Sequence, residues 1–328
     1  MRAAYGLGSL RFELREIAVP EPTEGQALVR VKACAICGSD KHEHSQAEVA
    51  DRVSGHEISG VVERVAGTAT DLEPGDEVCL APLWFCGKCK YCAVGRTSSC
   101  ISPEGVIGYT MPGGFAEYTT APVRTMCPKP SGISFEQAAL TEPLAVAVRA
   151  VSILDVAAHD CLVFGAGAIG LMLAQVLKTR GAGQIFLTDI DEGHLELANQ
   201  LGDFVTLQSD DPAQWRKLEA ADIRIAFDAV GNVPAITQRA VERVKPGGAC
   251  VLIGAQDPDV LAATDFAHKR ISLLFSEGVH MSEMDEASRL MQTGEVDLGP
   301  LLSGTYPLER IEDAFEAARS GVKVIVEP

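Results

Sequence analysis

The sequence predicts an α/β protein in which an irregular β-rich domain accompanies a doubly wound parallel sheet. Three observations lead to this prediction: the chain length, a change near residue 131 from short β-like runs to a helical period, and a strand–helix alternation that begins at residue 161. On a prior of about 150 residues per domain, the 328 residues correspond to about two domains. The apolar fraction of 47 % and the charged fraction of 22 % are ordinary for a folded soluble protein.

Residues 1–130 contain short β-like runs separated by Gly and Pro turn signals. The run ALVRVKACAI (27–36) alternates and is β-branched, and GVVERVA (60–66) and DEVCLAP (76–82) follow it with an EPGD turn between them. The N-terminal MRAAYGLGSLRFELRE has neither the apolar core nor the small-residue cleavage site of a signal peptide, so it predicts a first strand. Together these runs predict an irregular β-rich domain.

A helical period runs from 134 to 154, interrupted by Pro143, and strands then alternate with helices. The predicted strands are CLVFGAG, QIFLTDI, FVTL, IRIAFDAVG and GACVLIG. Such a βαβα series predicts a parallel sheet covered by helices on both faces. The tail, 276–328, does not continue this strand–helix alternation, because it contains two amphipathic helices and a final VKVIVE strand. We expect the tail to return to the first domain.

The formal net charge is −17 at pH 7, which argues against a nucleic-acid partner because such a surface repels phosphate backbones. No apolar run reaches the roughly 18 residues of a membrane span, so we expect a cytoplasmic protein without a membrane partner. In that compartment the ten cysteines predict metal binding or catalysis rather than disulfides. Five of them lie among apolar or Gly/Pro-rich neighbours and are expected to be buried free thiols: Cys34, Cys79, Cys127, Cys161 and Cys250.

The segment FGAGAIG has glycines in G-x-G-x-x-G spacing between a predicted strand and a predicted helix. The three glycines permit a tight turn, close approach to a pyrophosphate, and close packing of helix on strand. The phosphates would lie over the helix N-terminus, where free N–H groups favour anions. This context favours a dinucleotide site over a glycine turn that merely connects two elements. The residues of the fingerprint expected at the cofactor are Gly165, Gly167, Ile169 and Gly170.

Asp189 ends the next predicted strand, nineteen residues after Gly170. A carboxylate at that distance accepts hydrogen bonds from the adenosine ribose and repels a 2′-phosphate, which favours NAD over NADP. Asp191 is the lesser candidate and is predicted to cap the following helix. The carboxyl ends of two later strands should approach the nicotinamide, which makes Val230 in DAVGN and Gly254 in LIGAQ further candidates for cofactor binding.

The segment FCGKCKYCAVGRTSSC (85–100) has four cysteines in C-x2-C-x2-C-x7-C spacing: Cys86, Cys89, Cys92 and Cys100. Short CxxC steps can place thiolates around one tetrahedral ion at Zn–S distances of about 2.3 Å. Four protein ligands leave no position for substrate, so a zinc site here would be structural. An iron–sulfur cluster is the rival, since it also takes four thiolates, but nothing nearby resembles a second redox centre and zinc is favoured.

The segments CAICGSDKHEH and SGHEISG carry a second set of candidate metal ligands. Cys37 ends a predicted strand, and His56 and Glu57 follow a short polar loop. Cys, His and Glu together suit zinc with room for a water or a substrate oxygen. Taken singly, Cys37 could be a buried thiol, and we expect His44 to be a solvated loop histidine.

With these motifs the chain resembles the zinc-dependent medium-chain dehydrogenases of the alcohol dehydrogenase superfamily over nearly its whole length. The resemblance rests on CGSD, GHE, the four-cysteine segment, GGFAEYTTAP, TEPLAVAVRA, FGAGAIG and TDID. The segments GGFAEY and TEPLA are more similar to the polyol and threonine dehydrogenase branch than to the animal ethanol-oxidising branch. The resemblance implies a GroES-like catalytic domain at 1–144 and 276–328 with a zinc lobe at about 84–102, a Rossmann NAD domain at 145–275, and an active cleft between them.

In that branch the catalytic zinc lies near a Cys, a His, the Glu after that His, and the Glu of EPL. The matching residues here are Cys37, His56, Glu57 and Glu142, and the two glutamates need not bind at once. The resemblance implies that zinc acts as a Lewis acid on the substrate oxygen while NAD accepts a hydride from the carbinol carbon.

The resemblance also implies a proton relay, in which Ser39 matches the family's relay hydroxyl and His42 the histidine that passes the proton to solvent. Asp40 fits a role in orienting the ring of His56, with a helix N-cap as its alternative. Three histidines have no partner in any motif and are expected at the surface: His159, His194 and His268.

The predicted function is hydride transfer between NAD and the secondary alcohol of a polyol, amino alcohol or aminocyclitol, or its ketone, with two zinc ions per chain. One rival is an NAD(P)H-dependent reductase of a carbonyl or activated alkene, which the candidate zinc ligands and Asp189 oppose. The other is a non-catalytic zinc- and NAD-binding sensor, which has no need for a proton relay. The expected partners are a small-molecule substrate and further copies of the chain in a dimer or tetramer, for which ISLLF (271–275) could be an interface strand or a buried one.

Overall fold

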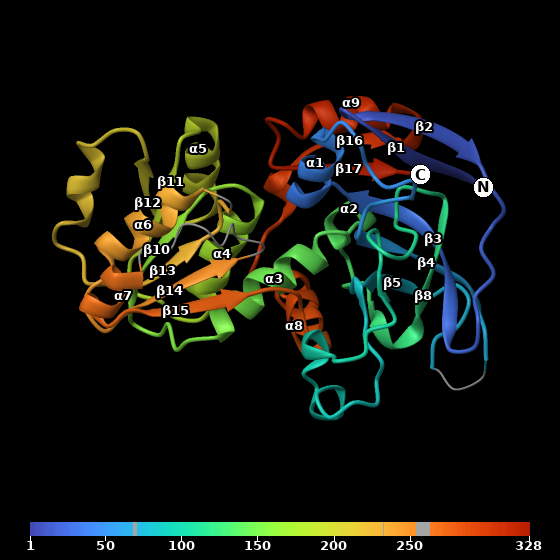
Figure 1. The fold of residues 1–328 in the computed structure, drawn as a ribbon, viewed down its shortest axis with the longest axis horizontal. Coiled ribbons are helices and arrows are strands. Elements are labelled where there is room, and N and C mark those ends of the chain that lie inside the picture. The colour runs from blue at the N-terminus through green and yellow to red at the C-terminus, as the bar shows by residue number, and fades with distance from the viewer. Residues whose placement is uncertain (68–70, 232, 254–262) are drawn as a thin grey trace. The chain divides into compact units, whose positions relative to one another are not determined.

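The computed structural model describes residues 1–67, 71–231, 233–253 and 263–328, and these form two compact units (Figure 1). Unit 1 comprises Met1–Ala145, Val279–Gly294 and Leu298–Pro328, and unit 2 comprises Val146–Gly278 and Glu295–Asp297. Gly254, one of the residues expected at the cofactor, lies outside the described residues. Among the helices described, none has the length and apolar character needed to cross a bilayer.

Unit 1 is built on a seven-stranded sheet in the order β16-β17-β3-β4-β5-β9, with β8 also paired to β3. The strands are β3 (Gln26–Ala35), β4 (Glu57–Val65), β5 (Glu77–Leu80), β8 (Tyr118–Pro122), β9 (Met126–Pro128), β16 (Leu302–Pro307) and β17 (Lys323–Glu327). The last strand, β17, pairs antiparallel with β3, so the end of the chain lies in the sheet built by its first third. The pairing of Ala35 with Glu57 places the end of β3 beside the start of β4.

The N-terminal segment is a hairpin and not the single strand that was expected. Strands β1 (Arg2–Gly8) and β2 (Arg11–Glu16) pair antiparallel, and Ser9 and Leu10 between them have φ angles of 51° and 58°. Two successive left-handed residues are the geometry of a tight hairpin turn, which usually selects Asn-Gly. The Ser-Leu pair carries no such signal, which explains why the pattern predicted one strand.

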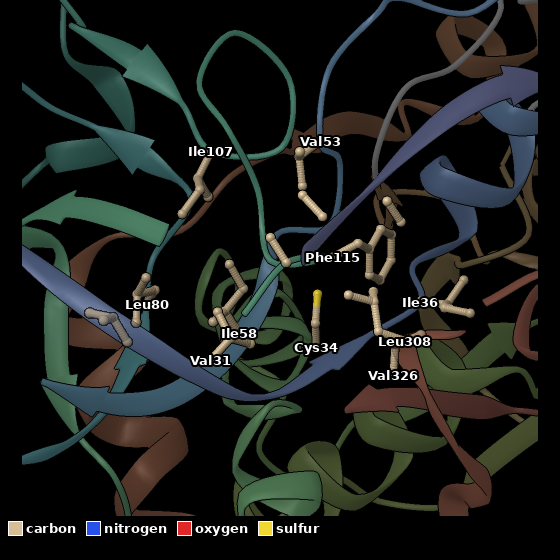
Figure 2. Packing of buried hydrophobic residues seen from close by; sticks show 14 of the residues in the cluster. Val31, Cys34, Ile36, Val53, Ile58, Leu80, Ile107, Phe115, Leu308 and Val326 are labelled. Carbon is tan, nitrogen blue, oxygen red and sulfur yellow. The ribbon is translucent and has the colours of Figure 1, made fainter. Parts of the chain in front are cut away.

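Unit 1 has one extensive buried apolar cluster, and Phe115 is fully buried in it. The Phe115 ring meets Phe315 edge to face at 5.7 Å between centroids. Figure 2 shows Phe115 among side chains from three strands of the sheet, namely Cys34 on β3, Ile58 on β4 and Val326 on β17. Because close-packed interiors have little freedom to shift, this cluster fixes the strand ends that carry the candidate site.

The helices of unit 1 are short and lie between or after its strands. They are α1 (Gly38–Ser45), α2 (Phe135–Ala138), α8 (Met281–Gln292) and α9 (Ile311–Ala317), while α3 (Thr141–Ser152) continues from unit 1 into unit 2. The helical run expected from 134 to 154 is therefore two helices. Pro143 does not break the second one, because it lies in the first turn, where a missing N–H costs no helical hydrogen bond.

Unit 2 contains a six-stranded sheet in the order β12-β11-β10-β13-β14-β15, and all five pairings are parallel. The strands are β10 (Asp160–Phe164), β11 (Ile185–Asp189), β12 (Val205–Gln208), β13 (Ile223–Asp228), β14 (Ala249–Ile253) and β15 (Ser272–Ser276). Counted from β10, this is the order 3-2-1-4-5-6 of the doubly wound dinucleotide-binding fold. The predicted parallel sheet is thus confirmed.

The helices of unit 2 follow the strands in turn: α4 (Ala168–Thr179), α5 (Glu192–Leu201), α6 (Pro234–Arg243) and α7 (Ala263–Lys269). Helix α4 is buried over most of its length, as its nearly continuous apolar sequence predicted. The strand order reverses around β10, between β11 and β13, and ligands of such sheets bind beyond the carboxyl ends of the strands at this point. The fingerprint glycines follow β10 directly.

Candidate functional site

Four cysteines come together in the lobe between β6 (Leu83–Trp84) and β7 (Gly105–Val106). The sulfur atoms of Cys86, Cys89, Cys92 and Cys100 all lie within 4.8 Å of one another. Two short 3-10 turns, η1 (Cys92–Val94) and η2 (Thr97–Ser99), bring the last cysteine back to the first three. Four sulfur donors at this spacing fit a tetrahedral zinc ion with no free position.

The lobe is fastened to the start of α8. The backbone N–H of Ser98 donates to His280 Nδ1 at 3.0 Å, and the N–H of Met281 donates to Thr97 Oγ1 at 3.2 Å. His280 therefore connects the lobe to α8, and both belong to unit 1.

Backbone N–H groups favour thiolates in this lobe. Hydrogen bonds from the backbone of Cys92 and Ile101 lower the pKa of Cys89 to about 6, and those from Lys88 and Cys89 lower the pKa of Cys86. Burial and the hydrogen bond shared with Cys89 raise the pKa of Cys92 to about 12. Since the thiolate is the ligand form, a divalent cation is needed for all four sulfurs to be charged together.

A second donor group forms where β3 ends and β4 begins. Gly55 has a φ of +90°, which a glycine adopts without strain, and a Cβ there would approach a core sulfur to 2.7 Å. This turn places His56 directly before β4, the strand that starts at Glu57. The Cys37 sulfur, one His56 ring nitrogen and one Glu57 oxygen lie within 4.8 Å of one another.

His56 is buried, and its Nδ1 makes no hydrogen bond within the part of the chain that the structure describes. The nearest carboxylate oxygen, Asp40 Oδ1, lies 3.9 Å away. Burial alone lowers the pKa of His56, but the charges of Cys37 and Asp40 raise it well above its ordinary value. The imidazole thus lies among negative charges that favour a bound cation. The sulfur, nitrogen and oxygen donors present here suit a zinc ion.

Asp40 connects the donor group to helix α1. Cys37 is the residue before the helix, and its backbone N–H donates to Asp40 Oδ2 at 2.9 Å. Asp40 is therefore not the N-cap that was considered for it; from the third helical position it closes the cap on Cys37 and also faces His56. Burial raises the pKa of Asp40, and the charge of His56 opposes that shift.

Glu57 is held by a lysine that the sequence patterns did not single out. Lys323 Nζ lies 2.5 Å from each carboxylate oxygen of Glu57 and 3.4 Å from the carbonyl oxygen of Ile36. The side chains of Glu57 and Lys323 are 1 % and 4 % exposed, so the pair is buried. Burial lowers the pKa of Lys323, but the charges of Glu57 and Cys37 raise it overall. A charged residue within the buried strand VKVIVE was the available signal.

Glu142, the fourth expected zinc ligand, lies in the first turn of α3 and is buried. It is not among the donors that approach one another within 4.8 Å in the described chain. Burial raises the pKa of Glu142 to about 7, with His56 opposing the shift and Glu57 adding to it. Of the two candidate carboxylates, the structure brings Glu57 to the donor group and leaves Glu142 outside it.

The relay candidates Ser39 and His42 both lie on α1 and are exposed. Ser39 Oγ accepts a 2.7 Å hydrogen bond from Tyr109, a residue outside every predicted motif. His44, on the same helix, was expected to be solvated and is instead buried. Its Nε2 lies 2.7 Å from Ser54 Oγ, and its ring packs against Phe12 and Phe315, because α1 turns this face onto the core.

The glycine loop after β10 has the geometry of a phosphate cradle. Gly165 has a φ of +91°, and a Cβ on Gly170 would lie 1.7 Å from the carbonyl oxygen of Gly165, so helix and strand pack with no room for a side chain. Gly167 is the N-cap of α4, and a Cβ there would meet no described atom within 4 Å. Ile169 lies in the first turn of α4, and Val230 lies over the loop. The open space before a helix N-terminus fits a pyrophosphate.

Asp189 ends β11 and accepts two backbone hydrogen bonds, from Ala166 at 2.6 Å and from Asp191 at 2.9 Å. His194 Nδ1 lies 3.5 Å from it, so the expectation that His194 is a surface residue without a partner is wrong. Burial raises the pKa of Asp189, but the hydrogen bond with His194 and those from the backbone lower it overall. Asp191 caps α5, as predicted, by accepting from the backbone N–H of His194.

Five further cysteines are buried free thiols, as predicted: Cys34, Cys79, Cys127, Cys161 and Cys250. Neither donor group contains any of them.

Comparison with known proteins gives matches to two family models. Residues 23–131 match the alcohol dehydrogenase GroES-like domain, and residues 168–293 match the zinc-binding dehydrogenase model. The chain is 31 % identical over 337 residues to L-threonine 3-dehydrogenase from Bacillus subtilis (strain 168), covering 98 % of this chain and 96 % of that protein.

Solved structures are also similar to this chain over its full length, and two examples are a short chain alcohol dehydrogenase and a butanediol dehydrogenase. A short chain alcohol dehydrogenase from Escherichia coli CFT073, complexed with cofactor NADH, has a TM-score of 0.90 at 25 % identity and covers 100 % of this chain and 99 % of that one. The 2R,3R-butanediol dehydrogenase from Bacillus subtilis has a TM-score of 0.86 at 25 % identity, with the same coverage. These matches confirm the predicted pairing of a GroES-like domain with a Rossmann-type domain.

The two donor groups predict two zinc ions per chain with separable consequences. Cys86→Ser is expected to lose one zinc and roughly 3 kcal/mol or more of unfolding free energy, because a closed site contributes its binding energy to folding. Cys37→Ser is expected to lose the other zinc with a smaller effect on unfolding. Metal analysis and urea unfolding of the purified variants measure both quantities.

The matched control is Cys161→Ala, which removes a buried thiol outside both groups and should retain two zinc ions. One zinc ion in the wild-type protein, or equal unfolding losses from Cys37→Ser and Cys86→Ser, would contradict this assignment.

The buried pair predicts that Lys323→Met destabilises the protein by about 3–5 kcal/mol, because it leaves the carboxylate of Glu57 buried without its partner. The double variant Lys323→Met/Glu57→Gln has no unpaired charge and should lose less than the single variant. Urea unfolding of the zinc-loaded proteins gives the free energies. A loss below about 1 kcal/mol for Lys323→Met, or strictly additive losses in the double variant, would show that the pair contributes little.

Proposed function

The chain belongs to the zinc-dependent medium-chain dehydrogenases of the alcohol dehydrogenase superfamily, and we propose that it transfers a hydride between a secondary alcohol, or its ketone, and NAD. The observation that carries this proposal is the open donor group of Cys37, His56 and Glu57 next to helix α1. Three protein ligands leave one position of a tetrahedral ion for a substrate oxygen, whereas the four-cysteine lobe leaves none.

The substrate class we propose is a polyol, an amino alcohol or an aminocyclitol. Two relatives support it by name, since one is a threonine dehydrogenase and another a 2R,3R-butanediol dehydrogenase. Both names denote small molecules with a secondary alcohol. The two rival functions, reduction of a carbonyl or activated alkene with NAD(P)H and non-catalytic sensing, lack a comparable supporting observation.

In this proposal Cys37, His56 and Glu57 hold the catalytic zinc, and Glu142 is an alternative carboxylate. A zinc ion held by these residues would supply Lewis-acid polarisation of the substrate oxygen. Asp40 faces the ring of His56 and keeps its orientation. Lys323 neutralises Glu57 without using all its lone pairs, because a carboxylate has about four acceptor positions. The buried site therefore does not accumulate uncompensated negative charge.

Ser39 takes the proton of the substrate hydroxyl in this mechanism, because it is the hydroxyl that follows Cys37 on the exposed start of α1. His42, one helical turn further on, is the second relay candidate. The chain's contribution to the proton transfer is thus to hold one hydroxyl beside the open donor position and to connect it to solvent.

Unit 2 is proposed to bind NAD through the glycine loop, with Asp189 on the adenosine ribose. NAD bound there would supply the nicotinamide ring as the hydride acceptor. The proposed contact residues are Gly165, Gly167, Ile169, Gly170, Asp189, Val230 and Gly254. The ionised Asp189 repels a 2′-phosphate, which supports NAD rather than NADP as the cofactor.

We further propose that unit 1 is the GroES-like catalytic domain and unit 2 the cofactor domain, with the four-cysteine lobe holding a structural zinc. The cytoplasm is the proposed location. A homo-oligomer, dimer or tetramer, is supported by β15, which lies at the edge of its sheet with Phe275 60 % exposed. A sheet edge with an exposed aromatic residue is a surface that proteins usually cover.

The function is tested with a panel of polyols, amino alcohols and aminocyclitols incubated with NAD and the zinc-loaded protein. We expect NADH formation, followed by its absorbance, with at least one secondary alcohol, and loss of this activity in Cys37→Ala. Turnover of quinones or activated alkenes with NADPH, without oxidation of any alcohol, would favour the reductase instead. Binding of NAD without any turnover would favour the sensor.

Cofactor choice is predicted to depend on Asp189. Asp189→Ala should reduce the ratio of kcat/KM for NAD to that for NADP by about tenfold or more, because the repulsion of the 2′-phosphate is removed. The matched control is Asp191→Ala, which removes a helix cap two residues away and should cost about 1 kcal/mol of stability without changing the ratio. A wild-type preference for NADP would show that the argument from Asp189 is wrong.

A further inference from the structure

Tyr109 lies outside every motif and contacts two residues of the proposed active site. Its hydroxyl donates to Ser39 Oγ at 2.7 Å, the usual length of a hydrogen bond between hydroxyl groups. Its ring lies 5.3 Å from the ring of His56, centroid to centroid, at an interplanar angle of 38°. One side chain thus contacts both the proposed relay hydroxyl and a proposed zinc ligand.

The Tyr109 segment is fixed to α1 by a second route that does not involve its hydroxyl. Arg52 Nε donates to the carbonyl oxygen of Gly108 at 3.0 Å, and Arg52 Nη2 contacts both carboxylate oxygens of Glu43 at 2.6 and 2.7 Å. The guanidinium carbon of Arg52 also lies 5.9 Å from the centroid of the Tyr109 ring. Since Glu43 and Ser39 belong to the same helix, this clamp sets the position of Tyr109 relative to Ser39.

We propose that Tyr109 is a positioning residue that orients the Ser39 hydroxyl and conducts its proton to solvent, an inference that rests on the proposed function. A hydroxyl group can donate and accept at the same time, so two hydroxyls in contact form a proton path without either becoming charged. Tyr109 is 38 % exposed and Ser39 is also exposed, so the pair of hydroxyls lies at the surface of the protein, where water can take up the proton.

The proton steps balance in both directions. In alcohol oxidation the substrate O–H bond breaks and a Ser39 O–H bond forms, the former Ser39 proton passes to Tyr109, and the former Tyr109 proton passes to water. In ketone reduction each transfer reverses, and the hydrogen bond from Tyr109 to Ser39 has the donor direction that reduction requires. The hydride and its two electrons stay with the alcohol and NAD, as in the proposed reaction.

The hydrogen bond to Ser39 favours Tyr109 over His42 as the next group in the proton path. His42 is exposed one turn along α1, and among the side chains described it has no hydrogen bond with Ser39. Tyr109 makes that bond, and the sequence spacing of 70 residues explains why no local motif contains it. The proposed path therefore runs from Ser39 to Tyr109 to water.

Tyr109→Phe tests this path, because it keeps the ring against His56 and removes only the hydroxyl. With a panel substrate, kcat for alcohol oxidation is expected to fall about tenfold, within the range of general acid–base effects, while KM for NAD stays within about twofold. The solvent deuterium isotope effect on kcat is expected to rise, since proton transfer becomes slower. Zinc content and the thermal midpoint should stay unchanged, which separates this role from a structural one.

A double-variant cycle sharpens the test. Because Tyr109 acts through Ser39, Tyr109→Phe should cause no further loss of kcat in a Ser39→Ala background. The matched control is Tyr306→Phe on β16, which removes a tyrosine hydroxyl elsewhere in unit 1 and should leave kcat and the isotope effect unchanged.

Two results would overturn the proposal: a Tyr109→Phe kcat within about twofold of wild type with the same isotope effect, or losses from Ser39→Ala and Tyr109→Phe that multiply. Either result leaves the proposed function intact if the wild-type protein oxidises an alcohol. Absence of wild-type turnover on the whole panel overturns the proposed function, and this inference with it.

Discussion

The buried ion pair between Glu57 and Lys323 is the interaction on which the candidate site depends. A carboxylate with 1 % exposure would be strongly unfavourable without a compensating charge, and the ammonium group 2.5 Å away supplies it. Lys323 reaches this position only because β17 adds to the sheet beside β3. The return of the chain end to unit 1 is therefore an electrostatic requirement of the site as well as a feature of its topology.

The two donor groups differ in how their charge is compensated. In the lobe, backbone N–H groups favour the thiolates of Cys86 and Cys89, and four sulfurs complete a closed set of ligands. At the open group, burial alone lowers the pKa of His56, but the charges of Cys37 and Asp40 raise it well above its ordinary value. A divalent cation at the open group would take the place of the proton that His56 otherwise holds. The roles proposed for the two groups follow from the number of ligands, since four sulfurs leave a zinc ion no free position and three donors leave one.

Local sequence patterns predicted those parts of the site whose geometry depends on the spacing of residues within one short segment. The glycine fingerprint, Asp189 and the four-cysteine lobe lie where expected, because each is a short run whose geometry follows from its own strand, helix or turn. The contacts that no pattern predicted join distant segments: Glu57 and Lys323 are 266 positions apart, and Ser39 and Tyr109 are 70 apart. His44 shows the same limit, since its burial depends on aromatic residues from both ends of the chain.

We propose that the reaction occurs at the open group of Cys37 and His56 and not at the four-cysteine lobe. Anomalous diffraction at the zinc absorption edge, from crystals of the zinc-loaded protein, tests it most directly. We expect two zinc peaks per chain: one enclosed by four cysteine sulfurs, and one bound by Cys37, His56 and a carboxylate with a remaining ligand that is not protein. A single peak in the lobe, or a second site closed by four protein ligands, would contradict it.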